Sequence, residues 1–412
     1  MALTPRDAAP KTPQPAQTTS LWRNRDYLLL WGGQALSDTG AAVSTLAFPL
    51  LVLLVTHSAT QAGLVGALNA LPRLFLTLLA GALVDRWDRR RIMLVCDTIR
   101  ALALASIPLG FALGWLTIWQ LSTVALIEGA LAVIFDLAND TAVAQVVSAE
   151  QLSSAVARDE VVERVVTLVG PSLAGALYSL SAMLPFLADA ISYVVSVVSL
   201  TLIHTPFQRE RTAQPRRLLA EIASGVRWVW RQPFILSMTL MMGAGAFTLS
   251  GVDLIIIVLA QRAGASAWVI GLIFAAGGVG GLVGAWLTPR LRLTVGQSIL
   301  SSRWFYALSW PFFALTPWPL ALGLITFGQW IFEPIEDIAY FSRRLKLIPD
   351  ELRGRVISVC RLAPGLTRPL GLALTGLLIQ RYGVFPTIWL GWVWILMATA
   401  LLTITPYVRR ER

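Results

Sequence analysis

The chain has 412 residues, of which 56% are hydrophobic and only 14% are charged, and its formal net charge is +10. Soluble domains carry about 25% charged residues, so this composition indicates a membrane protein. The positive charge does not indicate nucleic-acid binding, because the basic residues lie singly and in short clusters between apolar runs.

Twelve apolar segments follow one another along the chain, each long enough to cross a bilayer as a helix. They are residues 28–55, 62–84, 92–114, 119–147, 161–180 and 183–203 in the first half, and 234–260, 268–288, 298–316, 320–341, 356–379 and 384–406 in the second. The sequence therefore predicts an all-α membrane protein with twelve transmembrane helices in two six-helix halves.

Polar segments separate and flank these halves. The expected parts are a disordered cytoplasmic tail (1–20), the first half (21–203), a cytoplasmic linker (204–232), the second half (233–407) and a short cytoplasmic tail (408–412). The first tail lacks the apolar core of a signal peptide, so we expect the first span to direct insertion. In the linker, Leu218, Ile222, Val226 and Trp230 recur at helical spacing, which predicts an amphipathic helix on the inner membrane surface.

The basic residues also predict the orientation. Counted over the loops that join the twelve spans, nearly all arginines and lysines fall on one side of the membrane, and Arg262 and Arg381 fall on the other. Cytoplasmic loops carry the excess of basic residues. We therefore expect a multi-pass protein of the cytoplasmic (inner) membrane with both termini and the linker in the cytoplasm.

A densely charged turn joins the second and third spans. It reads Gly81-Ala-Leu-Val-Asp85-Arg86-Trp-Asp-Arg89-Arg90-Arg91 and interrupts two long apolar runs. A soluble core would not be interrupted in this way, whereas a turn between two spanning helices lies in water. We call Gly81–Arg91 the gate turn.

The gate turn resembles the signature between helices two and three of the major facilitator superfamily, although Asp88 stands where the general signature has a second glycine. Its Asp-Arg-Trp-Asp-Arg-Arg form resembles the branch that includes macrolide and enterobactin exporters. Further resemblances are Leu21-Trp22-Arg23, Gly33-Gln34-Ala35-Leu36-Ser37, Phe186-Leu187-Ala188-Asp189-Ala190 and Pro349-Asp350-Glu351-Leu352-Arg353-Gly354-Arg355. The family fold of two six-helix halves agrees with the span count.

The resemblance implies roles for two motifs. It makes Asp85 a latch that pairs with the start of helix eleven and breaks when the inner side opens; the alternative is that the charged turn only fixes topology. Gly170, Pro171 and Gly175 resemble the antiporter motif of helix five, which in this fold meets helix eight across the two halves. Small residues Gly277, Gly280, Gly281 and Gly284 on helix eight would form that seam, unless they serve ordinary tight packing.

Acidic residues inside the spans are the candidate proton or substrate sites, because an ionised carboxylate in hydrocarbon must face water, pair with a cation or take up a proton. They are Asp38 on helix one, Asp136 and Asp140 on helix four, Asp253 on helix seven, and Glu333, Glu336 and Asp337 on helix ten. The alternative is that structural ion pairs hold them, with Arg73, Arg361 and Arg368 as the available partners. For the helix-ten cluster we predict that at least one member pairs with Arg361 and that another remains free to titrate; the alternative partner is the basic cluster Arg343–Lys346. Glu128 is a further acid on helix four, and Asp189 on helix six matches a family position of structural character.

These residues lead to a functional hypothesis. Aromatic residues that could line an apolar cavity are Trp31, Phe48, Phe247, Trp304, Tyr306, Phe327, Trp330 and Phe332. Together with the resemblance they suggest a proton-coupled exporter of amphipathic small molecules by alternating access. The expected partners are such a substrate, protons and membrane lipid, the expected oligomeric state is a monomer, and no nucleic acid is expected.

Three alternatives remain open: an importer, a lysophospholipid carrier on the same fold, and a non-transporting membrane sensor or enzyme. The intact gate turn and the lack of a Ser–His or metal constellation argue against the last. Two cysteines and two histidines are too few for a disulfide framework or a His/Cys metal site, and there is no Walker phosphate loop. We therefore expect no enzyme activity, no metal and no cofactor.

Overall fold

A computed structural model describes residues 21–148, 150–205, 207, 218–316, 318–349 and 352–405, except for the side chains of residues 77–83, 85, 86 and 218–222. Within these ranges the chain is almost entirely helical. The predicted tails at 1–20 and 408–412 lie outside the described residues, and so does the linker stretch 208–217.

Six long helices occupy the first half of the chain. After the short 3₁₀ turn η1 (Leu21–Arg23) they are α1 (Arg25–Thr56), α2 (Ala59–Arg86), α3 (Arg89–Ala112), α4 (Ile118–Val146), α5 (Leu152–Leu180) and α6 (Leu184–Leu202). The starts of α1 and α4 are capped, because Asn24 and Thr117 accept hydrogen bonds from the backbone N–H of Tyr27 and Gln120.

The second half follows after α7, the linker helix (Leu218–Arg231). Its elements are α8 (Pro233–Leu249), α9 (Val252–Arg262), α10 (Ala267–Leu287), η2 (Thr288–Arg290), α11 (Val295–Ser309), α12 (Phe312–Leu315), α13 (Pro319–Leu347), α14 (Arg353–Tyr382) and α15 (Val384–Ile404). Nine helical segments of the described chain are long and apolar enough to cross a membrane, and α8 with α9 count as one of them.

Two predicted spans are interrupted. The span 234–260 divides between α8 and α9 next to Gly251, where a side chain would collide with Thr375 of α14. The span 298–316 divides between α11 and α12 at Pro311, a residue that cannot donate a backbone hydrogen bond. Hydropathy does not register either break, because the chain stays apolar through both.

Other helices are longer than predicted. Helix α5 begins nine residues before the predicted start at Val161, and α13 continues six residues beyond the predicted end at Phe341. Both extensions carry several charged residues, such as Arg158 and Lys346. A helix can continue from apolar surroundings into water because its backbone hydrogen bonds are internal, whereas a hydropathy criterion ends where the charges begin.

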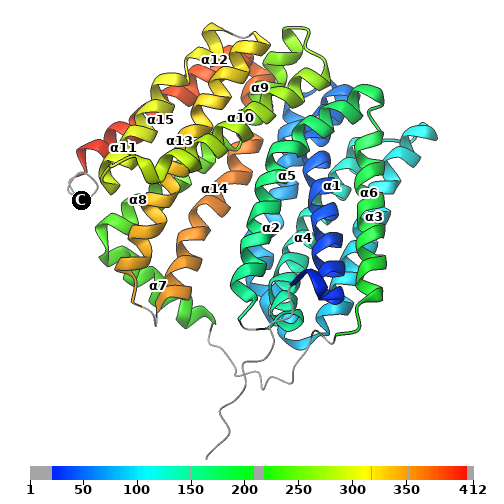
Figure 1. Cartoon of the computed structure of the whole chain (residues 1–412). Coiled ribbons are helices and arrows are strands. Elements are labelled where there is room, and N and C mark those ends of the chain that lie inside the picture. The colour runs from blue at the N-terminus through cyan, green and yellow to red at the C-terminus, as the bar shows by residue number, and fades with distance from the viewer. Residues whose placement is uncertain are drawn as a thin grey trace, which may run out of the picture.

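The helices form two groups, which we call the N-terminal group (α1–α6) and the C-terminal group (α8–α15), and Figure 1 shows them side by side. In the first group α1 packs against α5 and α6, and α3 packs against α4 and α6. In the second group α10 packs against α13, and α8 packs against α14. The principal contacts between the groups join α2 to α14 and α5 to α10.

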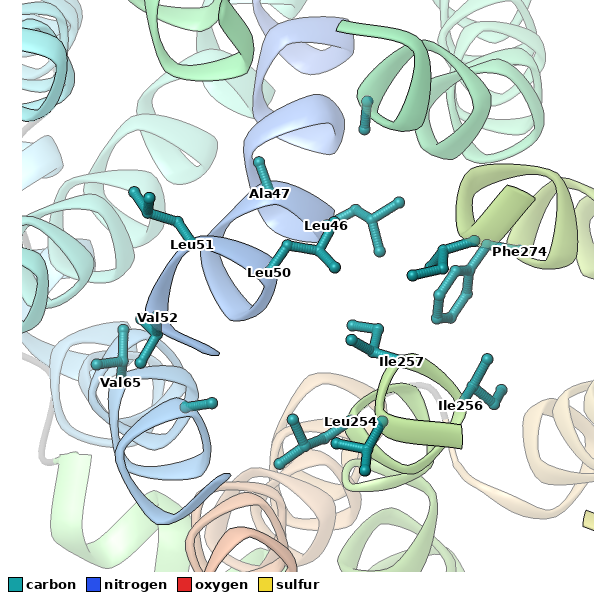
Figure 2. Close-up of a cluster of buried hydrophobic side chains, with 14 of the residues drawn as sticks. Leu46, Ala47, Leu50, Leu51, Val52, Val65, Leu254, Ile256, Ile257 and Phe274 are labelled. Carbon is teal, nitrogen blue, oxygen red and sulfur yellow. The ribbon is translucent and has the colours of Figure 1, made fainter. Parts of the chain in front are cut away.

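The two ends of this bundle differ. We call the end where α1 begins and α7 lies the linker end, and the opposite end, where α1 finishes at Thr56, the far end. Figure 1 shows the helices of the two groups diverging toward the linker end. At the far end, a buried apolar cluster combines Leu46 and Leu50 of α1 with Ile257 of α9 and Phe274 of α10 (Figure 2). Apolar packing therefore closes the far end across both groups.

Close backbone contacts reinforce this closure. Gly175 of α5 lies against Gly271 of α10, and a side chain at either position would collide with a backbone carbonyl of the other helix. The Ser179 hydroxyl accepts a hydrogen bond from the backbone N–H of Trp268 at 2.9 Å, joining the same two helices. At the contact between α2 and α14, the Gln380 side chain of α14 accepts a hydrogen bond from the backbone N–H of Ala59 of α2, also at 2.9 Å.

The glycines predicted to form the seam between the fifth and eighth spans, which are α5 and α10 in the structure, pack against different helices. A side chain at Gly280 or Gly284 would collide with backbone carbonyls of α13, so these glycines serve packing inside the C-terminal group. Gly170 likewise lies against Ala42 of α1, inside the N-terminal group. The seam between α5 and α10 is formed by Gly175 and Gly271 instead, and the assignment of the helix-eight glycines to that seam was wrong. Their spacing identified a small-residue face but not which helix packs on it.

Adjacent glycines on α10 allow a direct test of this packing. We expect Gly280→Ala to lower the free energy of unfolding by about 1–3 kcal/mol, because the new methyl group would meet the Phe327 carbonyl. Gly281→Ala is the matched control, since its methyl group would have its nearest neighbour, Trp330, at 3.9 Å. Thermal unfolding in detergent measures both. Equal melting temperatures for the two variants would contradict the close contact between α10 and α13.

Candidate functional site

Most of the candidate acids are exposed although they lie within apolar helices. Asp38 of α1, Asp136 and Asp140 of α4, and Asp253 of α9 are all exposed, and so are Glu333 and Asp337 of α13. Glu336 is the exception, with 6% of its surface exposed. Exposure in the middle of a spanning helix means contact either with lipid or with a water-filled opening, and the neighbouring charges distinguish the two.

These acids face the opposite group. Asp140 of α4 interacts electrostatically with Arg361 of α14, and Glu333 of α13 interacts with Arg164 of α5. Both interactions run from one group to the other, so the side chains lie on the inner faces of the two groups rather than on the lipid side. Asp140 and Glu333 therefore lie at the space between the groups, which Figure 1 shows widening toward the linker end and which we call the central opening. We infer that the other exposed acids line the same opening.

Asp38 is the acid with the most varied surroundings. Its Oδ1 accepts a hydrogen bond from Gln34 Nε2 at 2.9 Å, one turn earlier on α1. The charges that act on it come from Asp136 on α4, Glu163 on α5 and Arg100 on α3. The described part of the chain gives Asp38 no ion-pair partner within salt-bridge distance. It is thus an exposed carboxylate without a fixed counter-ion.

Asp136 has a cationic partner. Arg73 Nη2 of α2 lies 3.1 Å from Asp136 Oδ2, so Arg73 acts as one of the ion-pair partners considered from the sequence. The two side chains are 66% and 56% exposed, which makes their pairing worth at most about 1 kcal/mol. Such a pair can open without a large energetic penalty, and Asp136 remains accessible from the central opening.

The three acids of the tenth span, which is α13 in the structure, do not form the predicted ion pair. Glu336 Oε1 accepts hydrogen bonds from Nε, at 2.8 Å, and Nη2 of Arg303 on α11, and both side chains are nearly buried. The predicted partner, Arg361, lies exposed on α14, where it interacts with Asp140. Successive residues of a helix point 100° apart, so Glu336 faces α11 while Asp337 faces the opening. The predicted pairing of this cluster with Arg361 was therefore wrong: among the described residues the ion-pair partner is Arg303.

Asp253 and Arg368 approach each other without a salt bridge. Asp253 lies in the first turn of α9, directly after the break at Gly251, where the positive end of the helix dipole favours a carboxylate. Its main electrostatic partner is Arg368 of α14, which is exposed. The interruption of the seventh span thus places an acid at a helix start, within electrostatic reach of Arg368.

Two arginines of the gate turn bind backbone carbonyls of the N-terminal group. Arg90 donates from Nε to Leu200 O at 2.9 Å and from Nη2 to Thr201 O at 2.6 Å, and Arg89 donates to Phe207 O at 3.1 Å. The last carbonyls of a helix lack partners within the helix, and cations are favoured there. Arg90 therefore holds the end of α6 in place, and Arg89 holds the segment that follows this helix.

Asp88 of the gate turn has a local structural role at the start of α3. The Asp88 side chain accepts a hydrogen bond from the backbone N–H of Arg91 at 3.1 Å and caps α3, which explains an aspartate at this position. The side chains of Gly81, Asp85 and Arg86 fall outside the described part of the structure, so the latch role of Asp85 stays a prediction.

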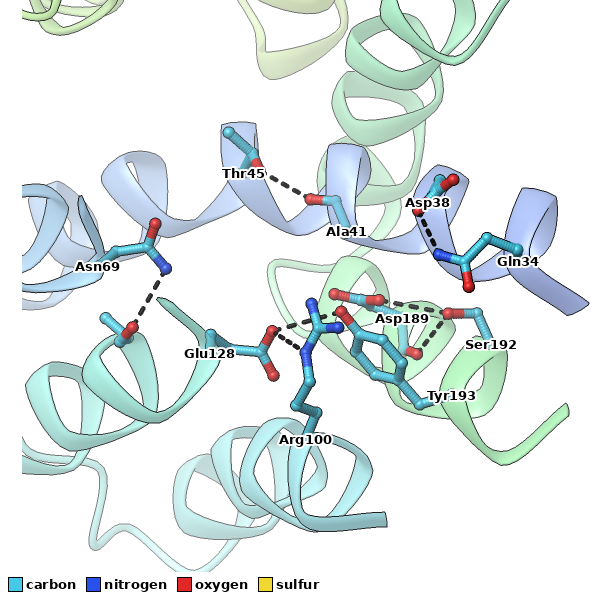
Figure 3. Close-up of polar contacts among 11 residues, drawn as sticks. Gln34, Asp38, Ala41, Thr45, Asn69, Arg100, Glu128, Asp189, Ser192 and Tyr193 are labelled. Atoms are coloured by element: carbon cyan, nitrogen blue, oxygen red, sulfur yellow. Dashed lines mark hydrogen bonds and ion pairs between the residues drawn. The ribbon is translucent and has the colours of Figure 1, made fainter. Parts of the chain in front are cut away.

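A buried polar cluster in the N-terminal group was not predicted as a site (Figure 3). Arg100 of α3 donates from Nε to Glu128 Oε2 of α4 at 3.1 Å, and its guanidinium carbon lies 4.1 Å from the centre of the Tyr193 ring. Asp97 of α3 and Asp189 of α6 belong to the same cluster and are fully buried. The sequence contained the signal, since Asp97 and Arg100 are charges inside the third apolar span.

Several candidate aromatic residues pack inside one group. Phe48 contacts the Phe186 ring edge-to-face at 5.1 Å, and Phe332 stacks on Phe305 at 4.2 Å. Trp304 donates to the Thr403 hydroxyl at 3.1 Å. Phe48, Phe332 and Trp304 are therefore held by contacts within their own groups. In the part of the chain that the structure describes, no three His, Cys, Asp or Glu side chains are arranged to hold a metal ion.

Comparisons with known proteins give the family. The sequence model of the family described as transmembrane secretion effectors, a branch of the major facilitator superfamily, matches residues 16–410. The multidrug efflux pump Tap of Mycobacterium tuberculosis is 26% identical over 393 residues, covering 89% of each chain. Macrolide efflux protein A of Streptococcus pyogenes is 25% identical over 186 residues, covering 45% of this chain and 46% of that protein.

Solved structures show the same fold. A bacterial homologue of the iron transporter ferroportin in an inward-facing state is 18% identical, has a TM-score of 0.71, and is matched over 95% of this chain and 100% of its own. An outward-facing structure of such a homologue, 19% identical and matched over 94% of this chain and 100% of its own, has a TM-score of 0.57. The resemblance inferred from the gate turn is confirmed. The chain is a multi-pass membrane transporter related to multidrug efflux pumps, and it belongs to the transmembrane secretion effector family of the major facilitator superfamily.

Proposed function

We propose that the protein is a proton-coupled exporter of amphipathic small molecules, which works by alternating access in the cytoplasmic membrane. The observation that carries the proposal is the set of exposed carboxylates within the spanning helices. Asp38 is foremost, because it has no ion-pair partner among the described residues. Such groups are costly in a spanning helix unless they bind protons or cations. A carrier that exchanges protons for substrate needs carboxylates of this kind.

The relatives favour export. Tap and macrolide efflux protein A are efflux proteins by name, and Tap matches nearly the whole length of this chain. A multidrug pump handles varied substrates, and amphipathic solutes suit an opening in which carboxylates alternate with apolar helix faces. These relatives support an exporter over an importer or a lysophospholipid carrier.

The proposed topology has twelve spans. It counts α8 with α9 as one span and α11 with α12 as another, and it includes α2 and α13. The N-terminal and C-terminal groups then supply six spans each, with α7 between them. Because the arginines gather on the linker side, this end and both termini are assigned to the cytoplasm.

The proposed state of this structure is open toward the cytoplasm. Three observations support it: the apolar cluster across the far end, the glycine contact of α5 with α10, and the higher TM-score to the inward-facing than to the outward-facing ferroportin homologue. In the alternate state the two groups would separate at the far end and meet at the linker end. We propose that Asp85 then pairs with the start of α14.

The proposed cycle uses Asp38 as the exchange site. Substrate enters from the cytoplasm and binds beside the ionised carboxylate. After the groups rock, a proton from outside neutralises Asp38 and the substrate leaves. Return of the protonated carrier releases the proton to the cytoplasm. The coupling requires only that substrate and proton compete for the same carboxylate, so that binding of one displaces the other.

Everted membrane vesicles test the proposal. A labelled macrolide and a labelled cationic dye are offered outside vesicles that contain the protein, with and without an acidic lumen. We expect accumulation only with the acidic lumen, and a protonophore should abolish it. Vesicles without the protein provide the background. Accumulation that is independent of the pH gradient would contradict proton coupling, and movement only out of the lumen would indicate an importer.

A further inference from the structure

The buried cluster of the N-terminal group contains more negative than positive charge. Asp97 and Asp189 are fully buried, while Glu128 and Arg100 are each 7% exposed. Three carboxylates therefore share one guanidinium. An uncompensated charge at such a buried position costs several kcal/mol. Charge balance thus requires protons on two of the three acids in this state.

The contacts show which acid is ionised. Glu128 Oε2 accepts hydrogen bonds from Arg100 Nε at 3.1 Å and from the Tyr193 hydroxyl at 3.3 Å. The two aspartates have hydroxyl donors instead of a cation. Asp189 Oδ1 accepts from the Ser192 hydroxyl at 3.3 Å, and Ser44 also interacts with this acid. Asp97 Oδ2 accepts from the Ser196 hydroxyl at 2.6 Å. The charge of Arg100 is thereby assigned to Glu128, and the two aspartates carry the protons.

Both aspartates keep one oxygen without a partner. Asp189 Oδ2 and Asp97 Oδ1 are buried and have no hydrogen-bond partner among the described residues, and the same holds for Glu128 Oε1. Glu128 differs in that its other oxygen contacts the Arg100 guanidinium. A buried ionised carboxylate with a bare oxygen would be strongly destabilising, whereas a protonated one needs fewer partners. Because neither aspartate has a cation within ion-pair distance among the described residues, we assign the protons to these two acids.

Asp189 is additionally in contact with the helix that carries Asp38. A side chain at Gly40 of α1 would collide with Asp189 Oδ1 and with the Ser192 hydroxyl, so the α1 backbone rests directly on this acid (Figure 3). The charged groups with the largest electrostatic effect on Asp189 are Glu128 and Arg100. Arg100 acts on Asp38 as well. A movement of α1 would change the surroundings of Asp189, and a change of charge at Asp38 would reach it through Arg100.

We infer that Asp189 is a second proton-binding site, which holds a proton in the present state and releases it when substrate binds beside Asp38. In this step the O–H bond at Asp189 breaks and the proton passes to water in the central opening. Arg100 then lies between Glu128 and Asp189, so that two carboxylates share one guanidinium. The cluster carries one net negative charge, which is stable only while substrate is bound. The inference rests on the proposed proton-coupled function and adds a proton that Asp38 alone does not supply.

Proton release on substrate binding tests this site. The purified protein in weakly buffered detergent solution is mixed with the labelled macrolide, and a pH-indicator dye reports the protons released. We expect Asp189→Asn and Asp38→Asn each to lower the release by half, and the double variant to abolish it. Thr201→Val, on the same helix as Asp189 and bonded through its hydroxyl only to Val198 O, should release as much as the wild type.

The outcomes separate the two proposals. Unchanged release from Asp189→Asn, together with reduced release from Asp38→Asn, would overturn the second site and leave the proposed function standing. No release from the wild type would overturn both. In vesicles, Asp189→Asn should lose gradient-driven accumulation at least tenfold while substrate–substrate exchange continues, because exchange needs no net proton transfer. Wild-type accumulation in this variant would also overturn the inference.

An infrared measurement keeps the inference testable if Asp189→Asn fails to fold. In the Asp38→Asn variant, addition of the macrolide should remove one protonated-carboxyl stretching band. Ser192→Ala should shift that band, because it removes the hydroxyl that donates to Asp189. A spectrum without loss of any protonated-carboxyl band would show that the buried protons are permanent and structural.

Discussion

Asp38→Asn is expected to lower proton-driven export at least about tenfold while the protein still reaches the membrane. Asparagine keeps the size of aspartate and can still accept the hydrogen bond from Gln34, so the local structure should survive. It cannot bind or release a proton. Without a titrating group at this position, substrate and proton no longer compete, and a pH gradient cannot drive accumulation.

The measurement is accumulation in everted vesicles with an acidic lumen, normalised to the amount of protein in the membrane. Thr45→Val provides the control on the same helix, because Thr45 is exposed and its hydroxyl donates only to the Ala41 carbonyl. Wild-type accumulation by Asp38→Asn throughout the neutral pH range would refute the role of this carboxylate and leave Asp136, Asp140, Asp253, Glu333 and Asp337 as the remaining candidates.

Arg303→Gln should destabilise the protein by about 3–5 kcal/mol, because it leaves the buried carboxylate of Glu336 without its cation. Glu336→Gln should cost a similar amount for the converse reason. In the double variant neither charge remains, and two amides can hydrogen-bond to each other, so much of the loss should be recovered. Thermal unfolding in detergent is measured for the wild type, both single variants and the double variant. This double-mutant cycle gives the interaction energy of Arg303 with Glu336.

The exposed pair of Glu160 and Arg164 on α5 is the matched control. Its atoms are 2.7 Å apart, close to the separation in the buried pair, but its side chains are 55% and 60% exposed. Neutralising it should change the free energy of unfolding by no more than about 0.5 kcal/mol. If the losses from Arg303→Gln and Glu336→Gln simply added in the double variant, the two side chains would not interact in the folded protein.

Much of the local structure could be predicted from the sequence. The apolar segments predicted the positions of the helices to within a few residues in most cases, because a spanning helix must satisfy its own backbone and expose apolar side chains to lipid. Spacing alone also predicted the linker helix, now α7. The gate turn was sufficient to identify the superfamily, since its charges are adjacent in the chain and need no tertiary information.

The partners of the charged residues could not be predicted in this way. Arg303 was overlooked and Arg361 was chosen as the partner of the helix-ten acids, because both lie in apolar spans and hydropathy does not tell toward which neighbour a side chain points. In a soluble protein the polar stripe of a helix marks its outer face. In a membrane protein lipid and core are both apolar, so this signal is weak, and the rotation of α13 about its axis must come from packing.

The sequence by itself therefore determined where the helices lie along the chain, which turn carries the family signature, and that Asp38, Asp136 and Asp140 are unusual charges in spanning segments. Only the tertiary structure decided that Asp38 faces the central opening without a fixed counter-ion, that Glu336 is buried against Arg303, and that Asp97, Arg100, Glu128 and Asp189 meet in one cluster. The physical reason is the separation along the chain of the residues involved. Helix formation in a membrane depends on residues within one segment. The pairing of charges depends on how helices that are distant in the chain are packed and rotated against one another.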